Sequence, residues 1–306
     1  MSSEAPRHFL DISSQPVRVL RAILDDAASI VKDSQALRDT CAGCLLVNLF
    51  YEPSTRTRVS FEIAATRLGM RVVNVAASDS SVKKGETLMD SFLTLQAMSP
   101  DIIVVRHPEN GALEPLAAVA APGVHVVNAG DGSRAHPTQA LLDALTLMQH
   151  FDDLSSLKIL VAGDLHHSRV TRSGVALFKK LGVGEIRLCA PPGLEAGPTV
   201  SEGVRSFSDL NEALEGVDVV MMLRIQHERL AGIAIPDSER YHRRWGLTPE
   251  RLARAAPGCL VMHPGPMNRG VEIASEVADG PRSVILEQVA NGVAARMAGL
   301  RALVGA

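Results

Sequence analysis

The sequence lacks the basic charge, the long apolar runs and the cysteine pairs that mark several protein classes. Lys and Arg number 31 against 34 Asp and Glu, and the formal net charge of −3 gives no basic field for nucleic acid. No uninterrupted apolar stretch approaches the ~20 residues of a membrane span, and the opening MSSEAPRHFL contains no signal-peptide core. We therefore expect a cytoplasmic protein that binds neither nucleic acid nor a membrane.

Only two of the four cysteines, Cys41 and Cys44, have C-x-x-C spacing, and no second pair completes a zinc site. Cys44 begins the apolar run CLLVNLF, which favours a buried strand thiol over a redox or metal role. The glycines of a Walker loop and of a G-x-G-x-x-G fingerprint are also missing. The sequence therefore predicts no metal and no cofactor.

Short apolar runs alternate with helical patterns along the chain. This alternation predicts an α/β protein with parallel sheets covered by helices on both faces. The length suits two doubly wound domains better than one. The expected strands cover residues 44–50, 70–75, 101–105, 123–129, 157–163, 185–190, 217–223 and 259–264, and the expected helices 57–68, 86–98, 137–149 and 168–181.

The boundary between the domains is expected near residues 135–152, where a helix opens at HPTQALLDALTLMQH and a polar turn, DDLSS, follows. A last helix near residues 284–304 is expected to return to the first domain. We therefore assign residues 1–140 with 286–306 to the first domain and residues 141–285 to the second.

The densest cluster of guanidinium and hydroxyl groups, STRTR, follows an expected strand and opens an expected helix. Ligands of open α/β sheets bind beyond the carboxyl ends of the strands, and a helix start exposes unpaired backbone N–H groups. A hydroxyl cap from Ser54 or Thr55 is the alternative use. Such a cap leaves the charges of Arg56 and Arg58 opposed to the helix dipole, whereas a bound dianion reverses that penalty. We therefore predict a phosphate site.

Other polar clusters occupy similar places. The segment SDSSVKKGETLMDS, residues 78–91, places hydroxyl groups and two lysines before an expected helix. An exposed flexible loop is as good an interpretation of it as a ligand-binding segment. VVRHPENG puts Arg106 after a buried strand, and His136 precedes Pro137 at an expected helix start. A histidine there is ordinarily a cap or a surface group, but beside Arg106 it could polarise a carbonyl.

The second half repeats this arrangement with other groups. Arg169 follows a strand in VAGDLHHSRVTRSG, and Arg224 and Gln226 end a strand in VVMMLRIQHERL. Guanidinium binds carboxylate in a bidentate manner, so these arginines predict a carboxylate-rich small molecule. In VMHPGPMNRGVEI, Pro264 and Pro266 remove backbone donors and leave carbonyls that could accept from an amino or amide group.

Together these blocks resemble the aspartate/ornithine carbamoyltransferase family, and within it the aspartate carbamoyltransferase catalytic chains. STRTR, SSVKKGE, RHP, HPTQALLD, LRIQHER and HPGPMNRGVEI occur in the family's order over nearly the whole chain. STRTR and HPTQ are shared with the ornithine enzymes, whereas KKGE and LRIQHER are of the aspartate type. The HCLP block of the ornithine enzymes is replaced here by HPGP.

The resemblance implies transfer of the carbamoyl group of carbamoyl phosphate to the amino group of L-aspartate, giving N-carbamoyl-L-aspartate and phosphate in pyrimidine biosynthesis. It implies that the first domain binds carbamoyl phosphate and the second binds aspartate. It also implies a homotrimer with shared active sites, and it leaves open whether regulatory chains or a dihydroorotase join the trimer.

The implied site residues group by the part of the ligand that they would hold. The phosphate would be held by Ser54, Thr55, Arg56, Thr57 and Arg106. The carbonyl oxygen would be held by Thr57, Arg106 and His136, and the amide by Gln139 and the backbone at Gly265 and Pro266. Aspartate would be held by Arg169, Arg224 and Gln226. Lys84, with Ser80, would enter from a neighbouring chain and touch both substrates. The catalytic residues would be Arg56, Thr57, Lys84, Arg106 and His136.

Donors oriented in advance would stabilise the negative charge that grows on oxygen, without a metal or a covalent intermediate. No side chain stands out as a general base, and the departing phosphate could take the amine proton. The segment IQHERLAGIAIPDSERYHRRWG, residues 225–246, is expected to be a long charged loop involved in domain closure.

Two alternatives stay open: a carbamoyltransferase with another amine acceptor, and a non-catalytic α/β module that closes on an anion. The carbonyl-side donors Thr57, Arg106 and His136 argue against the module, because binding alone would not need them.

Overall fold

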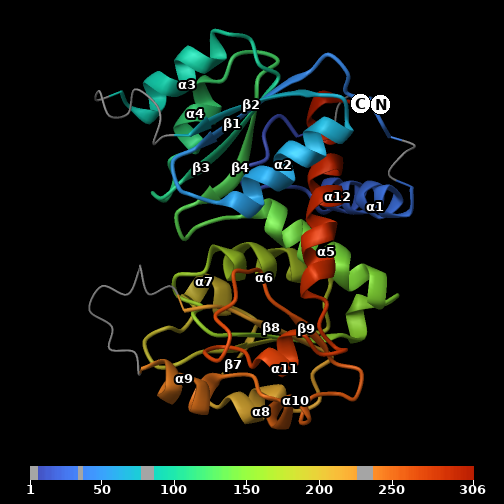
Figure 1. Cartoon of the computed structure of the whole chain (residues 1–306), viewed down its shortest axis with the longest axis vertical. Coiled ribbons are helices and arrows are strands. Elements are labelled where there is room, and N and C mark those ends of the chain that lie inside the picture. Colours follow the sequence, from blue (N-terminus) through green and yellow to red (C-terminus); the bar gives the residue numbers. More distant parts are fainter. Residues whose placement is uncertain (1–5, 34–36, 77–85, 226–236) are drawn as a thin grey trace. The chain divides into compact units, whose positions relative to one another are not determined.

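The described residues form a four-stranded sheet and a five-stranded sheet, and every strand pair in them is parallel (Figure 1). The structure is a computed structural model that describes residues 6–33, 37–76, 86–225 and 237–306. The chain divides into a first unit, residues 1–145 and 290–306, and a second unit, residues 146–289. Within the described ranges, no helix is long and apolar enough to cross a bilayer.

The first unit is built on a sheet whose inner strands, β1 and β3, are buried runs of Leu, Ile and Val. Such continuous apolar runs arise because helices cover both faces of a parallel sheet. The strands are β1 Leu45–Phe50, β2 Arg71–Ala76, β3 Ile102–His107 and β4 His125–Asp131, in the order β2-β1-β3-β4. The helices are α1 Val17–Lys32, α2 Thr55–Arg67, α3 Leu88–Gln96, α4 Glu114–Val119, most of α5 Pro137–His150 and most of α12 Ile285–Val304.

The second unit has a wider sheet in the order β7-β6-β5-β8-β9. Its hydrophobic side chains pack on both faces of the sheet in two clusters. The strands are β5 Lys158–Ala162, β6 Glu185–Cys189, β7 Arg205–Phe207, β8 Val219–Met222 and β9 Leu260–Met262. The helices are α6 Arg169–Leu181, α7 Pro198–Ser201, α8 Leu210–Leu214, α9 Ser238–Trp245, α10 Pro249–Leu252 and α11 Ser275–Ala278, with a 3-10 helix at Leu154–Ser156.

Each sheet has one point where the direction of its strand order reverses. In the first sheet the chain leaves β1 toward β2 on one side and β3 toward β4 on the other. In the second sheet the same reversal lies between β5 and β8. The backbones that follow β5 and β8 approach each other closely there. A Cβ added to Gly163, just after β5, would lie 2.4 Å from the carbonyl oxygen of Leu223, just after β8. Ligands of open α/β sheets bind at such reversals, beyond the carboxyl ends of the strands.

The predicted fold class of two doubly wound parallel-sheet domains is confirmed, and so is the return of the C-terminal helix to the first unit. The expected strands are all present, with ends shifted by about one or two residues, the usual uncertainty of such boundaries. Strand β7 was not predicted, because Arg205–Phe207 is too short and too polar to form an apolar run. Helix α3 begins at Leu88 rather than 86, because Thr87 and Asp90 form a capping box before it.

The expectation of a charged loop over residues 225–246 is wrong for its last part, which is helix α9. Asp237 caps this helix by accepting from the backbone N–H of Arg240, at 2.9 Å. Tyr241 and Trp245, one turn apart, are buried in the core of the second unit. The helix was missed because it has little apolar content: Tyr241 and Trp245 have helical spacing, but every other residue of the helix is polar or charged.

The expectation of a buried strand thiol at Cys44 is also wrong. Cys44 is half-buried and precedes β1, whereas Cys41 is the buried member of the pair. Burial raises the pKa of both thiols. A raised pKa suppresses the thiolate, which is the reactive form, and this is the opposite of a redox C-x-x-C motif.

We expect Trp245→Ala to lower the free energy of unfolding of the second unit by about 3–5 kcal/mol, because truncation of a buried aromatic leaves a cavity. Arg243→Ala is the matched control, since Arg243 is an exposed residue of the same helix whose side chain forms a 3.3 Å surface ion pair with Glu239. It should change stability by less than about 0.5 kcal/mol. Chemical denaturation followed by circular dichroism measures both. Equal stabilities for the two variants would contradict the anchoring role of Trp245.

Candidate functional site

The STRTR segment starts helix α2 directly after strand β1. Ser54 is the N-cap residue, with φ −159° and ψ 88°, but its side chain makes no capping bond to the helix backbone. Its hydroxyl instead donates to Oγ1 of Thr57, 3.0 Å away. Thr57 is buried, whereas Thr55 and Arg56 are exposed. The helix therefore begins without the hydroxyl cap that was the alternative use of Ser54 or Thr55.

The charges at the start of α2 oppose the helix dipole. Its first turn contains Arg56 and Arg58 and no acidic residue, although the positive end of the dipole and the unpaired N–H groups lie there. Helix α6 of the second unit has the same arrangement, with Arg169 and Arg172 in a first turn that lacks acidic residues. Both helix starts therefore suit a negatively charged ligand.

Arg106 is a cation buried at the carboxyl end of β3, with 7% of its surface exposed. In the strand register it lies opposite Phe50 of β1, next to the chain that leads into α2. Its Nη1 donates to the carbonyl oxygen of Ala129 at 3.1 Å, and its Nη2 donates to Oε1 of Glu52 at 2.8 Å. A buried charge needs such partners, and the two bonds set the position of the guanidinium group at the reversal.

Helix α5 brings two further candidates to the same edge of the sheet, because it follows β4, the neighbour of β3. His136 is buried directly before the helix, and its carbonyl oxygen accepts from the backbone N–H of Gln139 at 3.0 Å. Pro137 begins the helix, where its missing N–H costs nothing. The side chain of Gln139 donates through Nε2 to Oδ1 of Asp143, one turn further on, at 3.0 Å.

Two arginines occupy the corresponding edge of the second sheet. Arg169 is the first residue of α6, after β5, and is almost fully buried. The preceding Ser168 caps this helix by accepting from the N–H of Thr171 at 3.0 Å. Arg224 follows β8 and is half-buried. Because the reversal of this sheet lies between β5 and β8, both cations follow the strands that border it.

The HPGP loop after β9 is held by a buried histidine and a buried carboxylate. The N–H of Gly265 donates to Nδ1 of His263 at 2.9 Å, which leaves the ring proton on Nε2 to donate to Oε1 of Glu272 at 3.2 Å. The same Glu272 oxygen accepts from the N–H of Asn268 at 2.5 Å. The carbonyl groups of Gly265 and Pro266, named as amide acceptors, therefore lie on a loop fixed at both ends.

The structure places the candidate residues within each unit as follows. Ser54, Thr55, Arg56, Thr57, Arg106, His136 and Gln139 lie at the carboxyl edge of the first sheet, and Arg169, Arg224, Gly265 and Pro266 lie beyond strands of the second. Ser80, Lys84 and Gln226 lie outside the described residues.

Four charged residues that support the candidates were not singled out from the sequence: Glu52, Asp143, Glu272 and Arg296. Asp143 stands in the HPTQALLD block, four positions after Gln139, and that helical spacing was the available signal. Nothing in the sequence shows that its carboxylate is buried.

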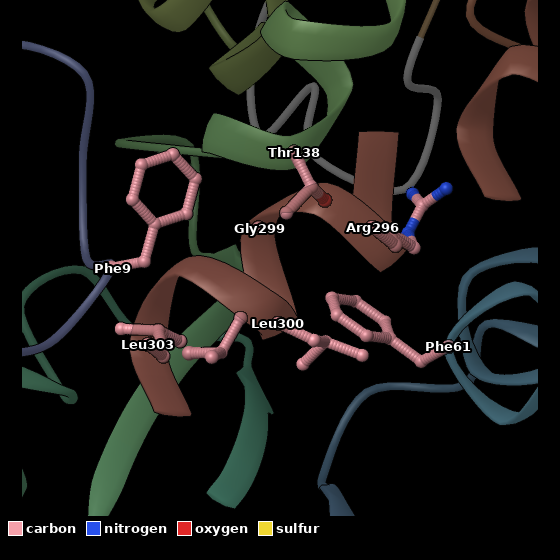
Figure 2. Close-up of a pocket in the computed structure, with 8 residues that line it drawn as sticks. Phe9, Phe61, Thr138, Arg296, Gly299, Leu300 and Leu303 are labelled. Carbon is pink, nitrogen blue, oxygen red and sulfur yellow. The ribbon is translucent and has the colours of Figure 1, made fainter. Parts of the chain in front are cut away.

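A small cavity inside the first unit is lined by none of the candidate ligand-binding residues, although the supporting Arg296 borders it. Its volume is about 10 Å³, and its lining is Phe9, Phe61, Val127, Thr138, Arg296, Gly299, Leu300 and Leu303 (Figure 2). Ligand sites enclose hundreds of cubic ångströms, so this cavity is a packing defect beside α12 rather than a substrate site.

Comparison with protein families matches both halves of the chain. Residues 7–149 match the model described as the aspartate/ornithine carbamoyltransferase carbamoyl-P binding domain. Residues 155–303 match the aspartate/ornithine carbamoyltransferase Asp/Orn binding domain.

Solved structures of both branches are similar over the whole length. Aspartate transcarbamoylase from Trypanosoma cruzi, in complex with carbamoyl aspartate and phosphate, is 30% identical with a TM-score of 0.89, covering 99% of this chain and 97% of that one. Ornithine carbamoyltransferase from Pyrococcus furiosus is 26% identical with a TM-score of 0.88, covering 100% and 99%. The catalytic subunit of M. jannaschii aspartate transcarbamoylase is 30% identical with a TM-score of 0.83, covering 98% of each chain.

Proposed function

The chain belongs to the aspartate/ornithine carbamoyltransferase family, and we propose that it transfers the carbamoyl group of carbamoyl phosphate to the amino group of L-aspartate. The products are N-carbamoyl-L-aspartate and phosphate. The observation that carries the choice of acceptor is the pair of cations Arg169 and Arg224 beyond the strands that border the reversal of the second sheet. Two guanidinium groups suit a dicarboxylate, whereas they would repel the cationic side chain of ornithine.

In this proposal the first unit holds carbamoyl phosphate. The phosphate lies against the start of α2, where the exposed Arg56 and the N–H groups of the first turn meet it. Arg106, fixed by Glu52, reaches both the phosphate and the carbonyl oxygen. The residues assigned to carbamoyl phosphate are Ser54, Thr55, Arg56, Thr57, Arg106, His136 and Gln139, with Ser80 from a neighbouring chain and the backbone of Gly265 and Pro266.

The second unit holds aspartate through Arg169, Arg224 and Gln226. We also propose that Lys84 enters from a neighbouring chain of a homotrimer, so that active sites are shared. The protein would then act in the cytoplasm in pyrimidine biosynthesis. The complexes with carbamoyl phosphate, and with carbamoyl phosphate and aspartate, of the Trypanosoma cruzi enzyme support this pair of substrates.

The proposed chemistry is attack of a neutral amine on an acyl carbon that phosphate already activates, so it uses no metal or cofactor. Negative charge grows on the carbonyl oxygen as the new C–N bond forms, and donors held in advance at Thr57, Arg106 and His136 stabilise it. The C–O bond to phosphate then breaks, and the departing phosphate takes the amine proton. Holding both reactants in line supplies up to ~7–11 kcal/mol in the most favourable cases.

A different amine acceptor is the second candidate, because ornithine carbamoyltransferases match at 26% and 28% identity, close to the aspartate enzymes. A phosphate-release assay with carbamoyl phosphate and a panel of amino acids separates the candidates. We expect release to depend on L-aspartate. Release with L-ornithine alone would overturn the acceptor assignment, and no release with any amine would favour a non-catalytic anion-binding module.

We expect Arg56→Ala to reduce turnover to less than a tenth of the wild-type rate, a loss of more than ~1.4 kcal/mol of transition-state stabilisation, because a charge-assisted bond to the phosphate is lost. Arg67→Ala removes the same charge from the exposed last turn of the same helix and should leave the rate unchanged. Steady-state kinetics on both variants tests this. An Arg56→Ala enzyme that retains most of its activity would remove Arg56 from the site.

We expect two inactive variants, Arg56→Ala and Lys84→Ala, to restore activity when their chains are mixed. In a cyclic trimer each site takes one group from each of two chains. A mixed ring then holds one intact site of three, and equal random mixing gives about a quarter of wild-type activity by this symmetry. Mass spectrometry confirms the exchange of chains. Exchange without recovery would mean that Lys84 does not act across chains.

A further inference from the structure

The side chain of Gln139 is held by a buried carboxylate, and this contact decides which of its two polar atoms can meet a ligand. We infer that Asp143 is a positioning residue that fixes the orientation of Gln139 and so makes the site select a ligand amino group over a methyl group. The inference rests on the proposed function, because it takes carbamoyl phosphate as the ligand beside Gln139.

The geometry determines the orientation of the amide. Gln139 and Asp143 lie one turn apart on α5, so their side chains share one face of the helix. The carboxylate of Asp143 is fully buried, and its Oδ1 lies 3.0 Å from Nε2 of Gln139. An ionised carboxylate only accepts hydrogen bonds, so the NH₂ group of Gln139 must face it. The amide oxygen Oε1 is thereby turned away from Asp143.

A buried arginine of the C-terminal helix interacts electrostatically with Asp143. Arg296 of α12 is 4% exposed, and its Nη1 donates to Oγ of Ser60 and to the carbonyl oxygen of Gly292, both at 2.9 Å. Its guanidinium carbon lies 5.1 Å from the ring centre of Phe61, and Figure 2 shows both residues beside the small cavity. Burial lowers the pKa of Arg296 to about 10, while the charge of Asp143 opposes the shift. Arg296 is therefore a cation at neutral pH, and its charge favours the ionised form of Asp143.

The close packing of α12 on α5 leaves this guanidinium group little freedom. A Cβ added at Gly292 would lie 2.6 Å from Nη1 of Arg296 and 3.2 Å from Cδ2 of Leu142. The arginine therefore passes its own helix in close contact with Gly292. Its guanidinium group is held there by the two 2.9 Å hydrogen bonds, away from solvent.

The consequence is a site that is selective for a ligand with an NH₂ group. With its Oε1 facing the ligand, Gln139 can accept a hydrogen bond from the NH₂ group of carbamoyl phosphate. A methyl group offers no such donor. Acetyl phosphate has nearly the same shape with a methyl group in place of the NH₂, so it leaves that oxygen without a donor. A site built to hydrogen-bond a group discriminates against the analogue that lacks it. In Asp143→Asn the new amide can present a carbonyl or an NH₂ group, so Gln139 can turn over and the discrimination is lost.

Calorimetric titration with carbamoyl phosphate, acetyl phosphate and inorganic phosphate tests the inference on the full-length protein. We expect wild type to prefer carbamoyl phosphate over acetyl phosphate by at least about tenfold, which is ~1.4 kcal/mol. The preference should fall below about threefold in both Asp143→Asn and Gln139→Ala, and the double variant should show no further loss. Affinity for inorganic phosphate should stay within about twofold in every variant, which shows that the anion site is intact.

Asp26→Asn is the matched control, because Asp26 accepts a 2.6 Å bond from Arg301, another arginine of α12, and lies on α1. It should keep the wild-type preference. If Asp143→Asn loses affinity for inorganic phosphate, the double variant Asp143→Asn/Arg296→Met takes its place, since removing both charges leaves neither buried alone.

The outcomes separate this inference from the proposed function. A wild-type protein that does not bind carbamoyl phosphate contradicts the proposed function. A wild type that binds and turns over carbamoyl phosphate, but whose preference over acetyl phosphate survives in Asp143→Asn or is absent from the start, overturns the inference and leaves the function standing.

Discussion

The burial of parallel strands on both faces is the constraint from which the rest of the structure follows. Helices must cover each sheet, so only the edge at the carboxyl ends of the strands stays open for polar groups. At the reversal of the first sheet, this edge collects the start of α2 and the side chain of Arg106. At the reversal of the second, it collects Arg169 and Arg224.

Three candidate groups are held by carboxylates, of which Asp143 and Glu272 are fully buried and Glu52 is half-buried. Glu52 holds Arg106, Asp143 holds Gln139, and Glu272 holds the HPGP loop through His263. Buried charges of this kind are costly unless they are paired, so their value lies in orientation rather than in stability. Donors fixed before the ligand arrives need no reorganisation when charge develops, which is the property that carbamoyl transfer requires.

The blocks shared by the whole family and the arginines proposed to bind the acceptor lie in different units. The matched carbamoyl-P binding half contains the STRTR and HPTQ blocks, and the matched Asp/Orn binding half contains Arg169 and Arg224. The aspartate-type KKGE block also lies in the first half, so we expect the choice of acceptor to depend on groups of both units.

The sequence by itself determined the fold class and the position of STRTR, because buried strands are continuous Leu, Ile and Val runs and helix starts have local signals. Strand β7 was not predicted, because Arg205–Phe207 is short and polar. Helix α9 was not predicted, because Tyr241 and Trp245 are its two apolar residues and the rest are polar or charged. Only the tertiary structure decided the supporting contacts. Arg296 meets Ser60 and acts on Asp143 from the far end of the chain, and pairings between distant segments depend on packing, which no local pattern encodes.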